Sequence, residues 1–217
     1  MNKIKNSSSI YFTSLKPQKR LGEQVLREFE AEMGHLKSSS NLLLRLKKNK
    51  SRLSKPLIKN LQEKAIKLHR DIYDSSACAS INKGNFETFQ EFKEVLTENI
   101  KQKGNKANCW ENAIIVFTNL LKKGEKPRLF QVIVNSAAKE TANHYSVVVG
   151  LKNGAKIADP KTWGSKALVI DSWAKSVKPA HIALVDIETV LLAGQKSSEV
   201  KYYPVYTSFI AQKQLKQ

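Results

Sequence analysis

The sequence predicts an α+β protein in which helices come first and a mainly antiparallel β-sheet follows. Up to about residue 121, apolar residues recur at steps of three and four, the spacing that places them on one face of a helix. After residue 128, short runs rich in β-branched residues replace that spacing and indicate strands. The chain has 217 residues, 41% of them hydrophobic, and is therefore long enough to bury a core.

Five segments carry the helical spacing. The third begins well, because Ser54 is a suitable N-cap and Pro56 lies in the first turn. The fourth ends at Gly104-Asn105, a pair that favours helix termination. The predicted helices cover residues 21–33, 42–46, 54–72, 86–100 and 108–121.

The strand predictions depend on one tight turn. Asn153-Gly154 is typical of a two-residue hairpin, so the strand before it should pair with a returning strand over 156–158. Pro204 favours an edge position for the last strand, because proline cannot donate a hydrogen bond to a neighbouring strand. Residues 182–192 fit a helix or a strand. The predicted strands cover 129–134, 144–151, 156–158, 167–170 and 200–206.

Positive charge dominates the composition. The chain has 37 Lys and Arg against 19 Asp and Glu, a net charge of +18. The densest block runs from Lys37 to Lys59, with eight basic residues and no acidic one. Such a block suits an anionic membrane or an acidic protein surface, although a solvated pair of helices is the simpler interpretation. Nucleic acid is a poorer partner, because the block has no aromatic residue for base stacking.

Absent motifs exclude several classes of protein. Two cysteines cannot form a disulfide framework, and they lack the spacing of a zinc site. The glycine-rich phosphate loop, the dinucleotide fingerprint and the zinc-protease motif are all missing, so no metal or cofactor is expected. No apolar run reaches the roughly 18 residues of a membrane helix. The first 18 residues also lack the apolar centre of a Sec-type signal peptide.

The fifth helical segment opens with a cysteine. At the start of a helix, Cys109 would face unpaired backbone N–H groups and partial positive charge, which favour thiolate over thiol. The same N–H groups can hold the oxyanion of an acyl-transfer reaction. Gln102 and Asn108 are candidate oxyanion donors, and Trp110 is a candidate wall of a substrate pocket or a core residue. The alternative role for Cys109 is that of a small buried side chain.

A base and an acid follow the cysteine in chain order. His144 stands at a strand start, where a general base is held rigidly, and Asp171 ends an apolar strand, where it can orient the imidazole. Trp173 follows, and either lines the pocket or packs in the core. Asp159, across the predicted turn from His144, is an alternative acid. We favour Asp171, because Asp159 precedes Pro160 and so suits turn initiation.

These residues resemble the motifs of the transglutaminase-like and papain-like cysteine enzymes. The similarity covers about residues 105–177 and includes the cysteine-led helix, H-Y-S-V at 144–147, D-P-K-T-W-G at 159–164 and V-I-D-S-W-A at 169–174. The last motif departs from the usual Asp-Pro-Trp of the family, because Ser172 replaces the proline. The same motifs also resemble those of bacterial translocated effectors and toxins in this superfamily.

The resemblance implies a central helix bearing Cys109 packed on an antiparallel sheet, with a Cys109–His144–Asp171 triad that acts on amide groups of a host protein. Proteolysis, glutamine deamidation and transamidation all fit this triad. Secretion from a bacterium into a host cell is implied too. The expected organisation is a disordered tail (1–17), a basic helical docking region (18–75) and a catalytic core (76–217), in a monomer.

Two readings without catalysis stay open at this point. One is a basic helical adaptor in which the cysteine, histidine and aspartate are incidental. The other is a protein that binds nucleic acid or an anionic surface, which the net charge of +18 motivates.

Overall fold

The computed structural model describes residues 8–34, 36, 88–102, 104–137, 141–192 and 196–205, with scattered positions between 54 and 67. The predicted helix 42–46, Cys78 and nearly all of the block from Lys37 to Lys59 lie outside these residues. The described elements, in chain order, are α1 (Ser8–Met33), α5 (Phe89–Gln102), α6 (Cys109–Lys122), β1 (Arg128–Ser136), β2 (Thr141–Val149), η2 (Pro160–Thr162), β3 (Leu168–Asp171), β4 (Ser176–Pro179), α7 (Ala180–Leu192) and β5 (Ser197–Pro204).

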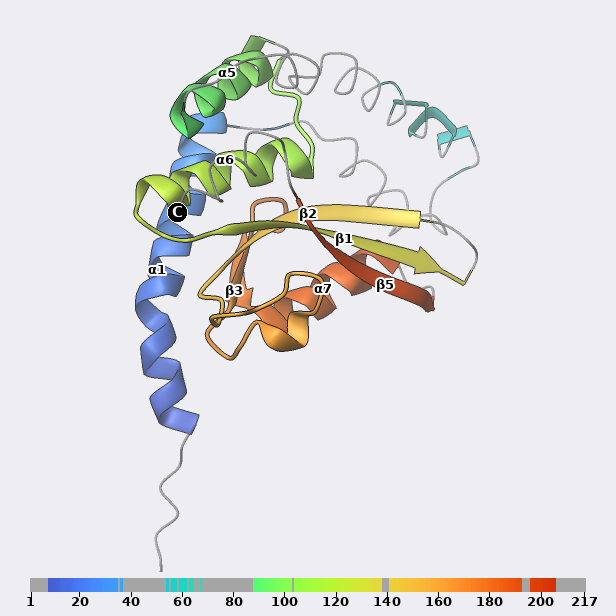
Figure 1. Ribbon diagram of the computed structural model, residues 1–217. Coiled ribbons are helices and arrows are strands. Elements are labelled where there is room, and N and C mark those ends of the chain that lie inside the picture. Colours follow the sequence, from blue (N-terminus) through green and yellow to red (C-terminus); the bar gives the residue numbers. More distant parts are fainter. Residues whose placement is uncertain are drawn as a thin grey trace, which may run out of the picture.

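The strands form one sheet in the order β4-β3-β2-β1-β5, with every neighbouring pair antiparallel (Figure 1). Between β1 and β2, Val132 lies opposite His144, and between β2 and β3, Val147 lies opposite Ile170. Strand β5 lies at an edge, as Pro204 predicts. The predicted α+β class and the antiparallel sheet are therefore confirmed.

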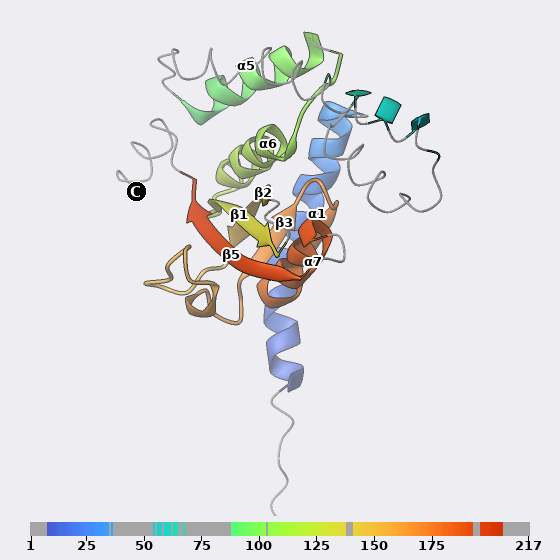
Figure 2. The same cartoon turned by 90° about the vertical axis from the view of Figure 1, so that its right-hand side faces the viewer.

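Helices cover both faces of the sheet (Figures 1 and 2). Helices α1, α5 and α6 pack on one face, and α7 packs on the other. The central strand β2 contributes to both cores, because Val147 and Val149 pack on the α6 side whereas Val148 packs on the α7 side. This alternation is the period of two expected from a strand that is buried on both faces.

Helix α6 lies at the centre of the larger core. Its residues from Glu111 to Leu120 are all buried, because the sheet, α1 and α5 surround it. Asn108 is the N-cap, and its backbone N–H donates a hydrogen bond of 2.9 Å to the Glu111 carboxylate. This reciprocal capping arrangement satisfies an N–H group at the helix start and fixes the first turn, where Cys109 lies.

Helix α1 belongs to the same core, although the sequence places it in the docking region 18–75. Val25, Phe29 and Met33 are buried in one cluster with residues of α5, α6 and the sheet. Three ion pairs also tie α1 to the other elements: Glu32–Lys93 at 2.6 Å, Glu28–Lys123 at 2.9 Å and Glu30–Lys175 at 2.8 Å. The helix is thus a structural part of the unit that carries the sheet.

The prediction of disorder over residues 1–17 is wrong from Ser8 onward, where α1 begins. The prediction gave weight to the polar residues of this segment, in particular the run of serines. The segment also contains apolar residues at helical spacing, such as Tyr11 and Leu15, four positions apart. In the described part of the chain, no helix, α1 included, combines the length and apolar character needed to cross a membrane.

The predicted returning strand over 156–158 is also wrong. Asn153 and Gly154 do form a turn, with φ of +77° at Gly154, but the chain continues into loop and the short helix η2. Strand β3 takes the place beside β2 instead. All four β3 residues are buried, so this pairing buries more apolar surface than 156–158, where Lys156 is exposed. Strand β4 was not predicted, and the ambiguous run 182–192 lies in α7.

Candidate active site

Cys109 is the first residue of α6, directly after the N-cap. The thiol is largely buried, with 7% of the residue exposed. The first N–H groups of any α-helix lack a partner within the helix, and they concentrate partial positive charge at this end. The position predicted from the sequence is therefore the position observed, and it is suited to a negatively charged sulfur.

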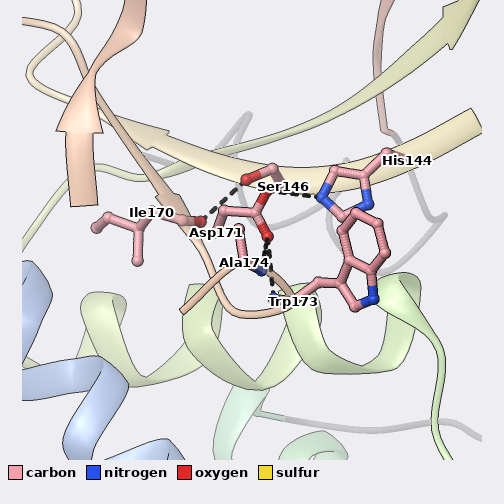
Figure 3. A network of polar contacts seen from close by, with 6 residues as sticks. All are labelled: His144, Ser146, Ile170, Asp171, Trp173 and Ala174. Carbon is pink, nitrogen blue, oxygen red and sulfur yellow. Dashed lines mark hydrogen bonds and ion pairs between the residues drawn. The ribbon is translucent and has the colours of Figure 1, made fainter. Parts of the chain in front are cut away.

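His144 and Asp171 form a buried pair on neighbouring strands (Figure 3). His144 Nε2 lies 2.8 Å from Asp171 Oδ2, and each residue is 2% exposed. His144 comes from the first half of β2, and Asp171 is the last residue of β3. The two meet because the antiparallel register of β2 and β3 brings the beginning of one strand beside the end of the other.

The Asp171 carboxylate is held at both oxygens. Oδ2 faces His144, and Oδ1 accepts hydrogen bonds from the backbone N–H groups of Trp173 at 2.9 Å and Ala174 at 3.0 Å. Beside this pair, Ser146 Oγ donates to the carbonyl of Ile170 at 3.0 Å and ties β2 to β3. The acid is thus fixed in orientation before any substrate arrives.

Cys109 lies within reach of the same imidazole. The Cys109 thiol interacts with the imidazole through hydrogen bonding and charge, and both effects raise the pKa of His144. Because Nε2 of His144 faces Asp171, Nδ1 is the ring nitrogen left for the sulfur. The three residues therefore form the sequence of sulfur, imidazole and carboxylate that a nucleophile, a base and an orienting acid require.

The surroundings of His144 favour its charged form. Burial is the largest influence and lowers the pKa, but the charge and hydrogen bond of Asp171, with those of Cys109, together raise the pKa of His144 to about 10. For Asp171, burial tends to raise the pKa, while His144 and the N–H groups of Ala174 and Trp173 bring it below its ordinary value. At neutral pH the pair is consequently an imidazolium and a carboxylate.

Two tryptophans flank the site. The Trp173 ring lies against the His144 ring, with 5.0 Å between centroids and an angle of 47° between the planes. It is half-buried, so it shields the imidazole on one side while keeping a surface toward solvent. Trp110, in the first turn of α6, is also half-buried and packs against the core. Trp173 therefore lies directly beside the imidazole, whereas Trp110 supports the core.

The other predicted site residues lie elsewhere or have other roles. Asp159 is exposed and caps η2 by accepting a hydrogen bond of 3.2 Å from the Lys161 N–H, so it does not face His144. Gln102 is exposed at the end of α5, where its amide donates to Glu98 at 3.0 Å. Asn108 remains at the helix start as the N-cap. The backbone N–H groups of the first turn of α6 are the donors that the fold places beside Cys109.

Three polar groups around the acid were not predicted from the sequence. The backbone N–H groups of Trp173 and Ala174 and the hydroxyl of Ser146 carry no side-chain motif of their own. An aspartate that accepts from N–H groups two and three positions later is a common turn, so the segment D-S-W-A could have indicated these bonds. Ser146 is the last polar residue before the apolar run Val147–Val149, and this boundary is the pattern available for that residue.

Nothing in the described residues indicates a metal centre, because no group of three or more His, Cys, Asp or Glu side chains is placed to hold an ion. No family model matches the chain, and neither a curated protein nor a solved structure matches it. The interpretation of the site thus depends on its geometry.

Proposed function

We propose that this protein is a thiol acyl-transfer enzyme that acts on amide groups of another protein, with Cys109 as nucleophile, His144 as acid and base, and Asp171 as orienting acid. The observation that carries the proposal is the buried His144 side chain, which is bonded to Asp171 at 2.8 Å and whose pKa is raised by the nearby Cys109 at the start of α6. A core histidine without a chemical role needs neither a thiol at a helix start nor a carboxylate fixed at both oxygens.

The reaction follows from the positions of these groups. The Cys109 sulfur attacks the amide carbon, and the electron pair of the carbonyl moves to its oxygen, which the N–H groups at the start of α6 stabilise. As the carbonyl re-forms, the carbon–nitrogen bond breaks and the departing nitrogen takes the proton from His144 Nδ1. A thioester remains on Cys109. Water or an amine then attacks it and returns a proton to His144, while Asp171 keeps the ring in place.

The second attacking group decides the product. Water yields a cleaved peptide bond when the amide belongs to the backbone, and a deamidated glutamine when it belongs to a side chain. An amine yields a transamidated product. The resemblance to papain-like and transglutaminase-like effectors supports a host protein as substrate and delivery from a bacterium, and both belong to this proposal. No cofactor takes part in these steps.

Mass spectrometry of candidate substrate proteins after incubation with the full chain tests the proposal. A gain of about one mass unit indicates deamidation, a covalent dimer indicates transamidation, and fragments indicate proteolysis. Cys109→Ala should abolish every such change, and Cys78→Ser is the matched control that should retain it. If Cys109→Ala keeps the modifying activity, Cys109 is not the nucleophile. If the variant loses that activity but keeps a cellular effect of the protein, a binding role accounts for the effect.

A further inference from the structure

A strongly basic surface lies at the end of β2 opposite to His144. Seven exposed basic side chains come from the first half of α1 and from the loop between β2 and β3; these form the basic patch: Lys16, Lys19, Arg20, Lys152, Lys156, Lys161 and Lys166. The two segments involved, 16–23 and 150–167, contain two carboxylates, Glu23 and Asp159, so their net charge is 7 − 2 = +5. None of its seven residues belongs to the sequence block from Lys37 to Lys59.

Close packing joins the two segments of the patch. A β-carbon added at Gly150 would lie 2.6 Å from the Lys166 carbonyl oxygen and 2.9 Å from Gln18 Oε1, so α1 and both ends of the loop meet at this glycine. Gly150 also has φ of +70°, which favours glycine. Figure 1 shows the loop next to the first half of α1, and Figure 2 shows the loop extending away from the helix at the same end of the molecule.

The loop has a fixed internal structure that presents its lysines outward. Lys152 N–H donates to the Trp163 carbonyl at 2.8 Å, and the Trp163 indole donates to the Lys156 carbonyl at 3.0 Å. Trp163 itself is 1% exposed and packs edge-to-face on Phe130, with 5.1 Å between ring centroids. The buried tryptophan anchors the loop, so the positions of the charges do not depend on a bound partner.

Little negative charge balances the basic patch. Within the described part of the chain, its ion pairing is limited to Lys19, which lies 3.9 Å from Glu23. The Asp159 carboxylate is engaged by the Lys161 backbone N–H as the cap of η2. A cluster of cations with so few counter-charges produces a field that draws anionic surfaces toward it.

We propose that the basic patch docks this protein on an anionic membrane surface. Six of its seven cations are lysines, whose compact charge suits diffuse attraction to lipid headgroups rather than paired hydrogen bonds to a defined ligand. Within the segments 16–23 and 150–167 the one aromatic residue is the buried Trp163, so these segments offer no aromatic side chain to stack on bases or to anchor a protein interface. A positively charged surface formed by α1 and the loop between β2 and β3 is therefore suited to a flat anionic bilayer.

Docking through this patch would leave the candidate active site accessible. Gly150 follows His144 by six residues along β2, which at about 3.3 Å per residue separates them by about 20 Å. A protein bound through the patch therefore keeps Cys109 and His144 away from the headgroups. The proposal is independent of the chemistry proposed for that site, because a protein without catalytic activity would carry the same patch.

Vesicle co-sedimentation of the full chain tests the proposal. Vesicles with about 30% phosphatidylserine should bind the protein at physiological salt, and vesicles of phosphatidylcholine alone should not. Lys161→Glu with Lys166→Glu should lower the partition coefficient at least about 25-fold, because each lysine near the surface contributes about fivefold. The matched control reverses Lys101 and Lys196, two exposed lysines outside the patch, and should bind nearly as the wild type does.

Three outcomes would overturn the proposal. The first is an equal loss of binding in the control pair, which would assign the attraction to net charge. The second is no binding to the phosphatidylserine vesicles at physiological salt. The third is displacement of the protein from the vesicles by RNA or an acidic protein that binds it more tightly than the vesicles do. That result would assign the patch to the class of macromolecule that displaces it.

Discussion

Replacing Asp171 by asparagine should separate charge from shape in the buried pair. Asparagine keeps the size of the side chain and an oxygen for the Trp173 and Ala174 N–H groups, but it removes the negative charge that faces His144. The native pKa of His144 is about 10, against an ordinary 6.5. That difference corresponds to about 5 kcal/mol in favour of the charged ring, at about 1.4 kcal/mol per pKa unit.

The titration of His144 is measurable by NMR from the chemical shifts of its imidazole. In Asp171→Asn, burial opposes the charged ring and Cys109 alone supports it, so the pKa of His144 should fall by at least about two units. Asp159→Asn is the matched control and should leave the titration at about 10, because Asp159 does not face the ring. A wild-type pKa near 6.5, or a pKa in Asp171→Asn within one unit of the wild type, would refute the reasoning.

Three further predictions concern stability. The free energy of unfolding should decline as pH rises from about 6.5 to about 10, because the pKa of His144 is higher in the folded state than in the unfolded state. Urea titrations over this pH range should show a smaller decline for His144→Gln. Glu111→Ala should lower the free energy of unfolding by about 1 kcal/mol in the same assay, because the Asn108 N–H loses its acceptor. Glu111→Gln keeps an acceptor oxygen and should retain most of that free energy. Gly22→Val should lower the stability by about 1–3 kcal/mol, because even a β-carbon added at this position would lie 3.0 Å from the Val177 side chain. Thermal melting measures this loss, and an unchanged melting temperature would contradict the packing.

Local patterns in the sequence were sufficient to predict most elements and the central part of the site. The spacing of Phe92, Leu96 and Ile100 predicted α5, and the apolar run after Cys109 predicted α6. The choice of Asp171 over Asp159 depended on Pro160, and the same proline does begin η2 with Asp159 as its cap. In each case the information lies within a few residues of the position concerned.

The remaining features depend on contacts between distant segments. Asn153-Gly154 predicts a turn, but only the competition between 156–158 and β3 for the edge of β2 determines which segment pairs there. The placement of α1 beside the sheet depends on contacts such as Gly22 with Val177, 155 residues apart in the chain (177 − 22). The spacing of apolar residues along one sequence does not show which distant segments come into contact. For this reason neither β4 nor the role of α1 could be predicted.

The alkylation rate of Cys109 tests most directly whether the three residues form one reactive unit. In a Cys78→Ser background, Cys109 is the remaining cysteine, and iodoacetamide labelling followed by intact-mass spectrometry reports on it alone. At neutral pH the thiol should react at least about tenfold faster with His144 present than in His144→Gln, because the imidazolium stabilises the thiolate. Equal rates in the two proteins would contradict the assignment of Cys109 and His144 to one catalytic site.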